Sequence, residues 1–110
     1  MKKINNWKST LLEKNSTIKK AFESLEKSAL QIILVYEKNL RFVGTITDGD
    51  IRRGLLNGIS FKDKIWKIVN NNSIVVSKNL NSDAIKNLMQ YNKIKALPIV
   101  SKERKILGLI

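Results

Sequence analysis

The sequence predicts an α+β fold made of two similar units in tandem. The first support is a weak internal repeat: residues 16–25 match residues 79–88 in pattern (79 − 16 = 63), and residues 40–46 match residues 104–110 (104 − 40 = 64). Two matches at nearly the same offset indicate a duplicated unit. The second support is the order of patterns within each copy, because a helical periodicity is followed by apolar runs joined by polar turns.

The first unit opens with a helix and continues as a β-hairpin. The apolar residues of the helix recur at i, i+3, i+4 and i+7, on one face: Ile18, Ala21, Phe22 and Leu25. Ser16 or Thr17 is suited to cap its start. The β-branched run 31–36 is typical of a buried strand, 37–39 is a polar turn, and 41–47 alternates as a second strand. The unit is therefore predicted to pair these two strands.

A short helix is expected after the hairpin. Asp50 is predicted to cap a helix over residues 51–57, and Gly58 is predicted to end it. Asp48 is assigned, with Gly49, to an Asx-type turn before the helix. The unit then reads helix, strand, strand, helix.

Arg52 and Arg53 are candidate anion-binding residues. A helix that begins near residue 51 would hold both cations in its first turn, where the helix dipole disfavours them. A bound anion would reverse that penalty, because free N–H groups and guanidinium groups would converge on it. The alternative is that both arginines extend into water or pair with Asp48 and Asp50.

The second unit is predicted to have a helix over 82–91, a strand over 96–100 and a last strand over 105–110. By analogy with the first unit, that strand lacks its polar end and the following helix, so a fragment with an incomplete second unit is expected. The boundaries are placed at 1–60 and 61–110. A further short strand is expected before each opening helix, at 7–12 and 73–77.

The composition excludes several kinds of site. The chain has neither Cys nor His, so disulfides, thiolate metal sites and imidazole catalysis are excluded, and no metal site or catalytic residue is assigned. The net charge of +12 comes mostly from dispersed lysines beside abundant asparagine, which favours compositional drift over a nucleic-acid groove. No apolar run is long enough to span a membrane, and no secretory signal precedes the first unit, so a cytoplasmic location is expected.

The repeat, the hairpin and the segment Gly-Thr-Ile-Thr-Asp-Gly-Asp-Ile-Arg-Arg (44–53) resemble a CBS-domain pair, also called a Bateman module, over essentially the whole chain. The resemblance implies two β-α-β-β-α units whose sheets pack about a pseudo-twofold axis, the second being truncated at its C-terminus. Such pairs commonly bind adenine nucleotides or similar ligands in clefts between the units. AMP, ADP, ATP or another nucleotide is therefore the expected ligand, and no other cofactor is required.

The resemblance also implies roles for particular residues. Thr47 and Asp50 match the ribose-phosphate signature, a Ser or Thr followed three positions later by Asp. Asp50 would accept hydrogen bonds from the ribose hydroxyls, and Thr47 would contact ribose or phosphate. The segment that usually lines the base has two copies: Leu30, Gln31 and Ile32 in the first unit, and Ala96, Leu97 and Pro98 in the second. Ile33 stands where a proline is usual.

The motif Thr-Asp-Gly-Asp-Ile-Arg-Arg at residues 47–53, together with Asn-Trp-Lys at residues 6–8, resembles the N-terminal CBS region of sugar-phosphate nucleotidyltransferases. A similar motif occurs in CBS pairs fused to sugar-phosphate isomerases, so an isomerase is the alternative catalytic domain. The expected function is a non-enzymatic, nucleotide-sensing module that controls a C-terminal catalytic domain and pairs as a homodimer. A ligand-independent dimerisation domain is the second hypothesis. Membranes and nucleic acids are not expected as partners.

Overall fold

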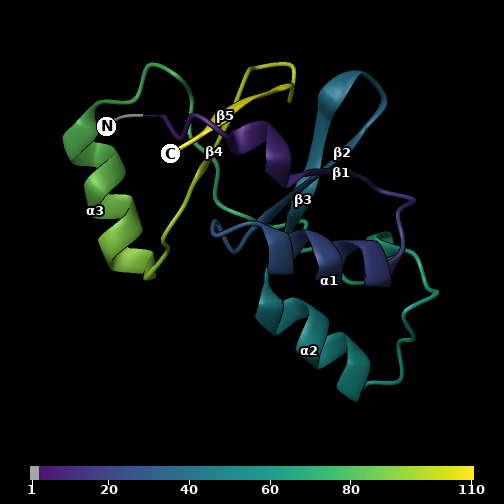
Figure 1. Cartoon of the computed structure of the whole chain (residues 1–110). Helices are drawn as coiled ribbons and strands as arrows, with labels where there is room; N and C mark the ends of the chain where they lie inside the picture. The colour runs from purple at the N-terminus through teal and green to yellow at the C-terminus, as the bar shows by residue number, and fades with distance from the viewer. Residues whose placement is uncertain (1–2) are drawn as a thin grey trace.

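The computed structural model describes residues 3–110, which form short strands and helices (Figure 1). Most of the expected elements form, with small shifts at their ends. The helices and strands are η1 Trp7–Thr10, β1 Leu11–Glu13, α1 Ile18–Lys27, β2 Ile33–Glu37, η2 Lys38–Leu40, β3 Arg41–Ile46, α2 Asp48–Leu56, η3 Ile65–Lys67, α3 Ser82–Asn92, β4 Pro98–Val100 and β5 Ile106–Leu109.

The strands form two small sheets. In the first sheet β1 lies parallel to β2, and β2 lies antiparallel to β3. In the second sheet β4 and β5 form an antiparallel hairpin, and a parallel bridge from Val76 to Ile99 takes the place that β1 holds in the first. The strand expected over 7–12 is thus largely wrong, because residues 7–10 form the 3₁₀ turn η1 and only the end of that stretch enters β1.

The two sheets repeat with a constant offset of 64 residues. Leu12 pairs with Val35 as Val76 pairs with Ile99, and both hairpins carry a bulge after the second residue of these pairs. The helix N-caps follow the same rule, since Thr17 caps α1 and Asn81 caps α3 (81 − 17 = 64). The offset of 63 predicted for the helices is therefore wrong by one residue.

A pseudo-twofold axis relates the two units. Arg41 of β3 and Lys105, just before β5, lie opposite each other in an antiparallel bridge, and they are equivalent residues (105 − 41 = 64). The neighbouring Phe42 N–H donates to the Arg104 carbonyl at 2.7 Å. Two equivalent residues that pair antiparallel with each other must lie beside the local twofold axis, so the predicted arrangement of the sheets is confirmed.

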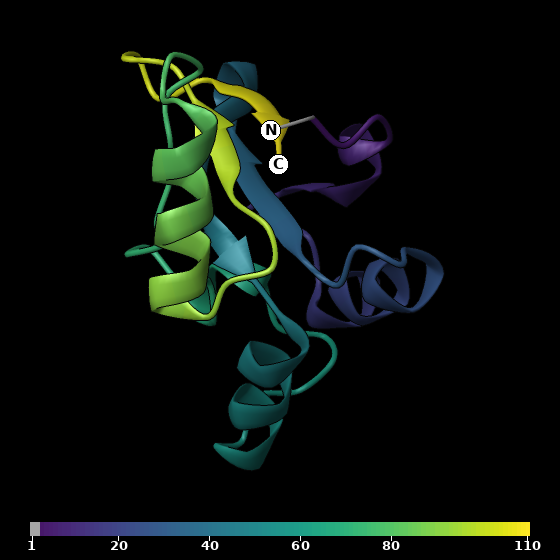
Figure 2. The same cartoon turned by 90° about the vertical axis from the view of Figure 1, so that its left-hand side faces the viewer.

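The core has three layers because successive side chains of a strand point to opposite faces. Ile33 and Val35 of β2 face the helices of the first unit, while Leu34 faces the second sheet. Ile99 of β4 packs beneath α3 in the same way. Figure 2 shows α3 on one side of the strands and α1 on the other. The middle layer, between the sheets, holds the two units together.

Each unit also borrows a segment from beyond its expected boundary. Ile65 and Asn70 lie after the predicted boundary at residue 60. Ile65 is nevertheless fully buried in the core of the first unit, and Asn70 pairs with Thr45 of β3. At the other end, the Ile4 N–H donates to the Leu109 carbonyl on β5. The division at residue 60 stays a prediction, and the packing around it is interleaved.

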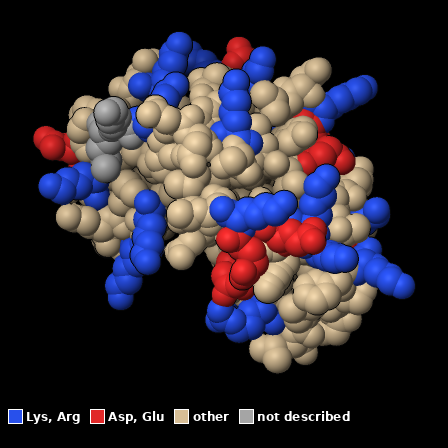
Figure 3. All heavy atoms as spheres, in the orientation of Figure 1, with Lys and Arg blue, Asp and Glu red and all other residues tan. Residues whose placement is uncertain are grey.

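Basic side chains are spread over the face drawn in Figure 3 and do not gather in one stripe. Within residues 3–110, no helix combines the length and apolar character that crossing a membrane requires.

Candidate functional site

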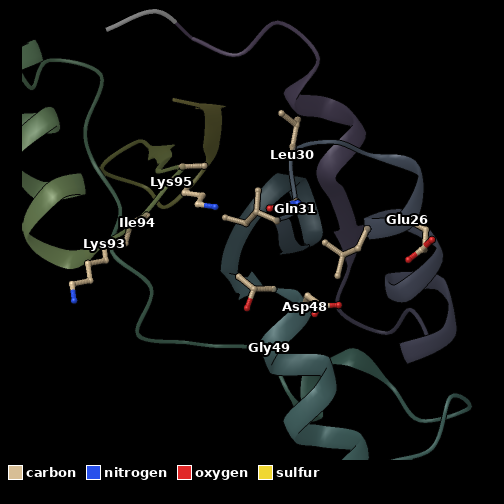
Figure 4. A pocket seen from close by; sticks show the side chains of 12 residues that line it. Glu26, Leu30, Gln31, Asp48, Gly49, Lys93, Ile94 and Lys95 are labelled. Carbon is tan, nitrogen blue, oxygen red and sulfur yellow. The ribbon is translucent and has the colours of Figure 1, made fainter.

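A cleft of about 580 Å³ lies between the two units, within the size range of small-molecule sites. Three segments line it: the end of α1 with the turn into β2, the start of α2, and the connection from α3 to β4 (Figure 4). The lining residues are Leu25, Glu26, Leu30, Gln31, Ile32, Thr47, Asp48, Gly49, Lys93, Ile94, Lys95 and Ala96.

The turn into β2 supplies the apolar side of the cleft from the first unit. Ser28 Oγ accepts a hydrogen bond from the Leu30 N–H at 3.1 Å, which fixes the chain after α1. Gln31 then adopts a left-handed conformation with φ 59°, and β2 begins two residues later. Leu30, Gln31 and Ile32, the segment predicted from the resemblance, all reach the cleft.

Thr47, the other predicted contact in this unit, lines the cleft as the N-cap of α2. The Asp50 carboxylate folds back onto it: Oδ2 accepts from the Thr47 N–H at 2.9 Å and from the Thr47 hydroxyl at 3.1 Å. Asp50 is thus the third helical residue and closes a capping box. The prediction that Asp50 is itself the N-cap is wrong, because the helix begins at Asp48.

This earlier start changes the place of both arginines. Arg52 pairs with Asp48, and Arg53 Nη2 donates to Asp50 Oδ1 at 2.8 Å. They lie beyond the first helical turn, so the helix-dipole argument for an anion beside them is wrong, and the alternative pairing with Asp48 and Asp50 is observed. Asp48 is helical and is not in an Asx turn. Neither arginine lines the cleft, and their contact with a ligand stays a prediction.

The start of α2 offers hydrogen-bond donors to the cleft. The N–H groups of Asp48 and Gly49 belong to the first turn, where a helix provides no partners for them. These groups carry the positive end of the helix dipole and favour anions. A Cβ on Gly49 would lie 3.2 Å from the Arg53 guanidinium, which is a tight contact with a side chain that does not line the cleft.

The second unit forms the opposite wall with residues 93–96. Lys93 ends α3 in a left-handed conformation with φ 54° and directs the chain back toward β4. Ala96 was predicted for this wall, whereas Leu97 and Pro98 are buried and do not line the cleft. Ile94 and Lys95 were missed. The 64-residue offset would have found them, because they are equivalent to Leu30 and Gln31.

Charges of both signs meet at the cleft. Glu26 and Asp48 contribute carboxylates, and Lys93 and Lys95 contribute ammonium groups. No group of three or more potential metal ligands occurs among residues 3–110. Together the lining residues can surround a flat apolar group and donate hydrogen bonds to an anionic one.

Asp63, which does not line the cleft, has a shifted pKa. The pKa of the Asp63 carboxyl is held below its usual value because the Ser60 N–H and the Lys67 ammonium group both donate to it.

Comparisons with known proteins agree with this architecture. Residues 8–57 match the model of the CBS domain family. The arabinose 5-phosphate isomerase GutQ of Salmonella typhi is 26% identical over 95 residues, which cover 86% of this chain and 30% of GutQ. The chain thus spans about 30% of the length of this curated relative.

Solved structures match nearly the whole chain. The CBS domain protein PAE2072 from Pyrobaculum aerophilum, complexed with AMP, has a TM-score of 0.79 at 18% identity and covers 92% of this chain and 78% of its own. The CBS domain pair of protein MJ0100, in complex with 5′-methylthioadenosine and S-adenosyl-L-methionine, has a TM-score of 0.77 at 24% identity and covers 91% of this chain and 82% of its own. These likenesses concern the fold.

Proposed function

Since the chain contains a CBS domain over residues 8–57 and folds as a CBS-domain pair, we propose that it is a regulatory module. The module would bind an adenine nucleotide, or another nucleotide, in the cleft between its two units. One observation carries the proposal. Leu30, Gln31, Ile32, Thr47 and Ala96, which were predicted as ligand contacts from separate parts of the sequence, line the same 580 Å³ cleft.

The lining suggests how a nucleotide would lie. The base would contact apolar side chains of both units: Leu30, Ile32, Ile94 and Ala96. The ribose would lie at Thr47, and its hydroxyls would donate to the Asp50 carboxylate once the Thr47 hydroxyl releases it. Arg53 stays a predicted phosphate contact, but it would first have to give up its ion pair with Asp50.

Regulation would follow from the position of the cleft. A ligand that touches both units binds one relative arrangement of the units better than another, and that difference in affinity shifts the population. We propose that the shift controls a sugar-phosphate enzyme domain attached to this module in the cytoplasm. The likeness to GutQ favours an isomerase, the alternative, over the nucleotidyltransferase expected first.

Titration calorimetry with AMP, ADP, ATP and S-adenosylmethionine tests the proposal. At least one of them should bind, and Thr47→Ala should weaken that binding by about tenfold, as expected for the loss of one hydrogen bond. Asn81→Ala is the matched control, because it also removes a helix N-cap and should cost a similar amount of stability, about 1 kcal/mol. Absence of binding, or equal affinity in the two variants, would contradict the proposal.

A dimerisation role is the second candidate, because several large apolar side chains between residues 55 and 66 are exposed. Leu56 is 81% exposed, Trp66 is 51% exposed and Phe61 is 45% exposed. Light scattering after gel filtration would support this role if the protein is a dimer both with and without nucleotide.

A further inference from the structure

Gln31 and Lys95 occupy equivalent positions in the two units (95 − 31 = 64), and both line the cleft. Figure 4 shows the Lys95 ammonium group directed into the cleft toward Gln31, whereas Lys93 points away from it. A strictly symmetric cleft would receive a ligand equally well in two directions. The lining of this cleft is not symmetric, and the exchange of a neutral amide for an ammonium group at this position adds a difference in charge between the two walls.

The charge near Lys95 is not compensated by the protein. Within residues 3–110, Lys95 is exposed and has no carboxylate partner. Of the two acidic residues at the cleft, Asp48 is paired with Arg52. Glu26 lies on α1, away from Lys95 in the close view (Figure 4). The wall formed by the second unit therefore carries a positive charge that no carboxylate of the described residues pairs with.

The first unit contributes to the same preference. The N–H groups at the start of α2 add donors and a positive dipole end to the cleft. The ion pair with Arg52 offsets the negative charge of Asp48, so Asp48 does not fully cancel the positive end of the α2 dipole. A ligand that carries phosphate meets donors from both units, whereas a nucleoside without phosphate meets only the apolar lining, Thr47 and Asp50.

We infer that Lys95 selects nucleotides that carry a phosphate over uncharged nucleosides, and that it directs the phosphate toward the second unit. The inference rests on the proposed function, since it specifies the ligand class of the same cleft. The Lys95 ammonium group donates a charge-assisted hydrogen bond to a phosphate oxygen, which is stronger than a bond between neutral groups. The base and ribose contacts do not involve Lys95.

The test compares AMP with adenosine by titration calorimetry, using the whole chain and its Lys95→Gln variant. The wild-type protein should bind AMP more tightly than adenosine. Lys95→Gln should weaken AMP binding by about tenfold and leave adenosine affinity within about twofold. Added salt should weaken AMP binding to the wild-type protein more than to the variant, because it screens the exposed charge.

Lys86→Gln is the matched control, because it removes the same charge from an exposed position on α3 that does not line the cleft. It should leave the ratio of AMP to adenosine affinities unchanged. If the wild-type protein binds AMP but Lys95→Gln binds it equally well, the role of Lys95 is overturned and the proposed function stands. If the wild-type protein binds neither compound, the role of Lys95 is overturned, and the proposed function is overturned with it only if ADP, ATP and S-adenosylmethionine also fail to bind.

Discussion

Gly44 and Gly108 are equivalent residues on β3 and β5, but their surroundings differ. A Cβ on Gly44 would lie 2.3 Å from the Asn70 carbonyl oxygen, where the returning chain pairs with β3. A Cβ on Gly108 would meet the side chains of Ile99 and Lys3 at 3.4 Å, an ordinary contact distance. Glycine is therefore required at one position of the repeat and optional at the other.

Gly44→Ala should accordingly destabilise the protein by about 3 kcal/mol, because the segment at Asn70 must move and its two hydrogen bonds to Thr45 are strained. Gly108→Ala is the control and should change the free energy of unfolding by less than about 1 kcal/mol. Urea denaturation measures both values. Similar losses in the two variants would show that the close approach at Gly44 is not what requires glycine.

Among the helices, α2 shows how one short motif permits two interpretations. The spacing Thr47-x-x-Asp50 matches a nucleotide signature and also a capping box, and the structure contains the capping box. The two uses are compatible, because the same carboxylate can exchange one hydroxyl donor for another. A substitution at either residue therefore changes both stability and binding, which is why Asn81→Ala is needed as a control that removes a helix cap outside the cleft.

The end of α3 provides a test of helix stability beside the cleft. Lys93 has φ 54° and its N–H donates to the last turn of the helix, the position where glycine is favoured. Lys93→Gly should raise the free energy of unfolding by about 1 kcal/mol, since the left-handed strain is removed.

Lys86→Gly, in the interior of α3, should lower the same free energy by about 1 kcal/mol. The opposite signs, measured by urea denaturation, would confirm that backbone conformation decides the effect. Destabilisation by both variants would contradict it.

At the scale of the whole molecule, the middle core joins the two units, and we expect them to unfold together. Leu34 of β2 is fully buried there, in the same cluster as Ile106 and Leu109 of β5. Trp7 packs against this cluster, while the exposed Trp66 lies in η3 beside the core of the first unit. The two tryptophans can therefore report on different parts of the molecule.

Leu34→Ala should cost about 2–5 kcal/mol, the range for a buried leucine. The urea transitions followed by Trp7 in a Trp66→Phe background and by Trp66 in a Trp7→Phe background should coincide, because both units share the core. Leu80→Ala, at a partly exposed site, should cost less than about 1 kcal/mol. Two separate transitions would mean that the units unfold independently.

Local patterns in the sequence were sufficient for much of the fold. The helices over 18–27 and 82–92 follow from apolar spacing and caps, and the hairpins follow from β-branched runs and turns. The start of α2 was misplaced because Thr47 and Asp50 are both good capping residues, and only the extended backbone at Thr47, with ψ 172°, distinguishes them. Because the helix begins three residues earlier than predicted, Arg52 and Arg53 lie beyond its first turn, and the helix dipole gives no reason to expect an anion beside them.

The sequence by itself determined the duplication and the elements of each unit, because these depend on short-range spacing and on a repeated pattern, and its resemblance to CBS pairs pointed to Leu30–Ile32 and Thr47. Only the tertiary structure decided which residues meet at the cleft. Lys95 is one of 21 basic residues and has no distinguishing local context, so its role depends on the pseudo-twofold axis that brings the second unit opposite the first. Contacts across that axis depend on packing between residues far apart in the chain, which local spacing does not encode.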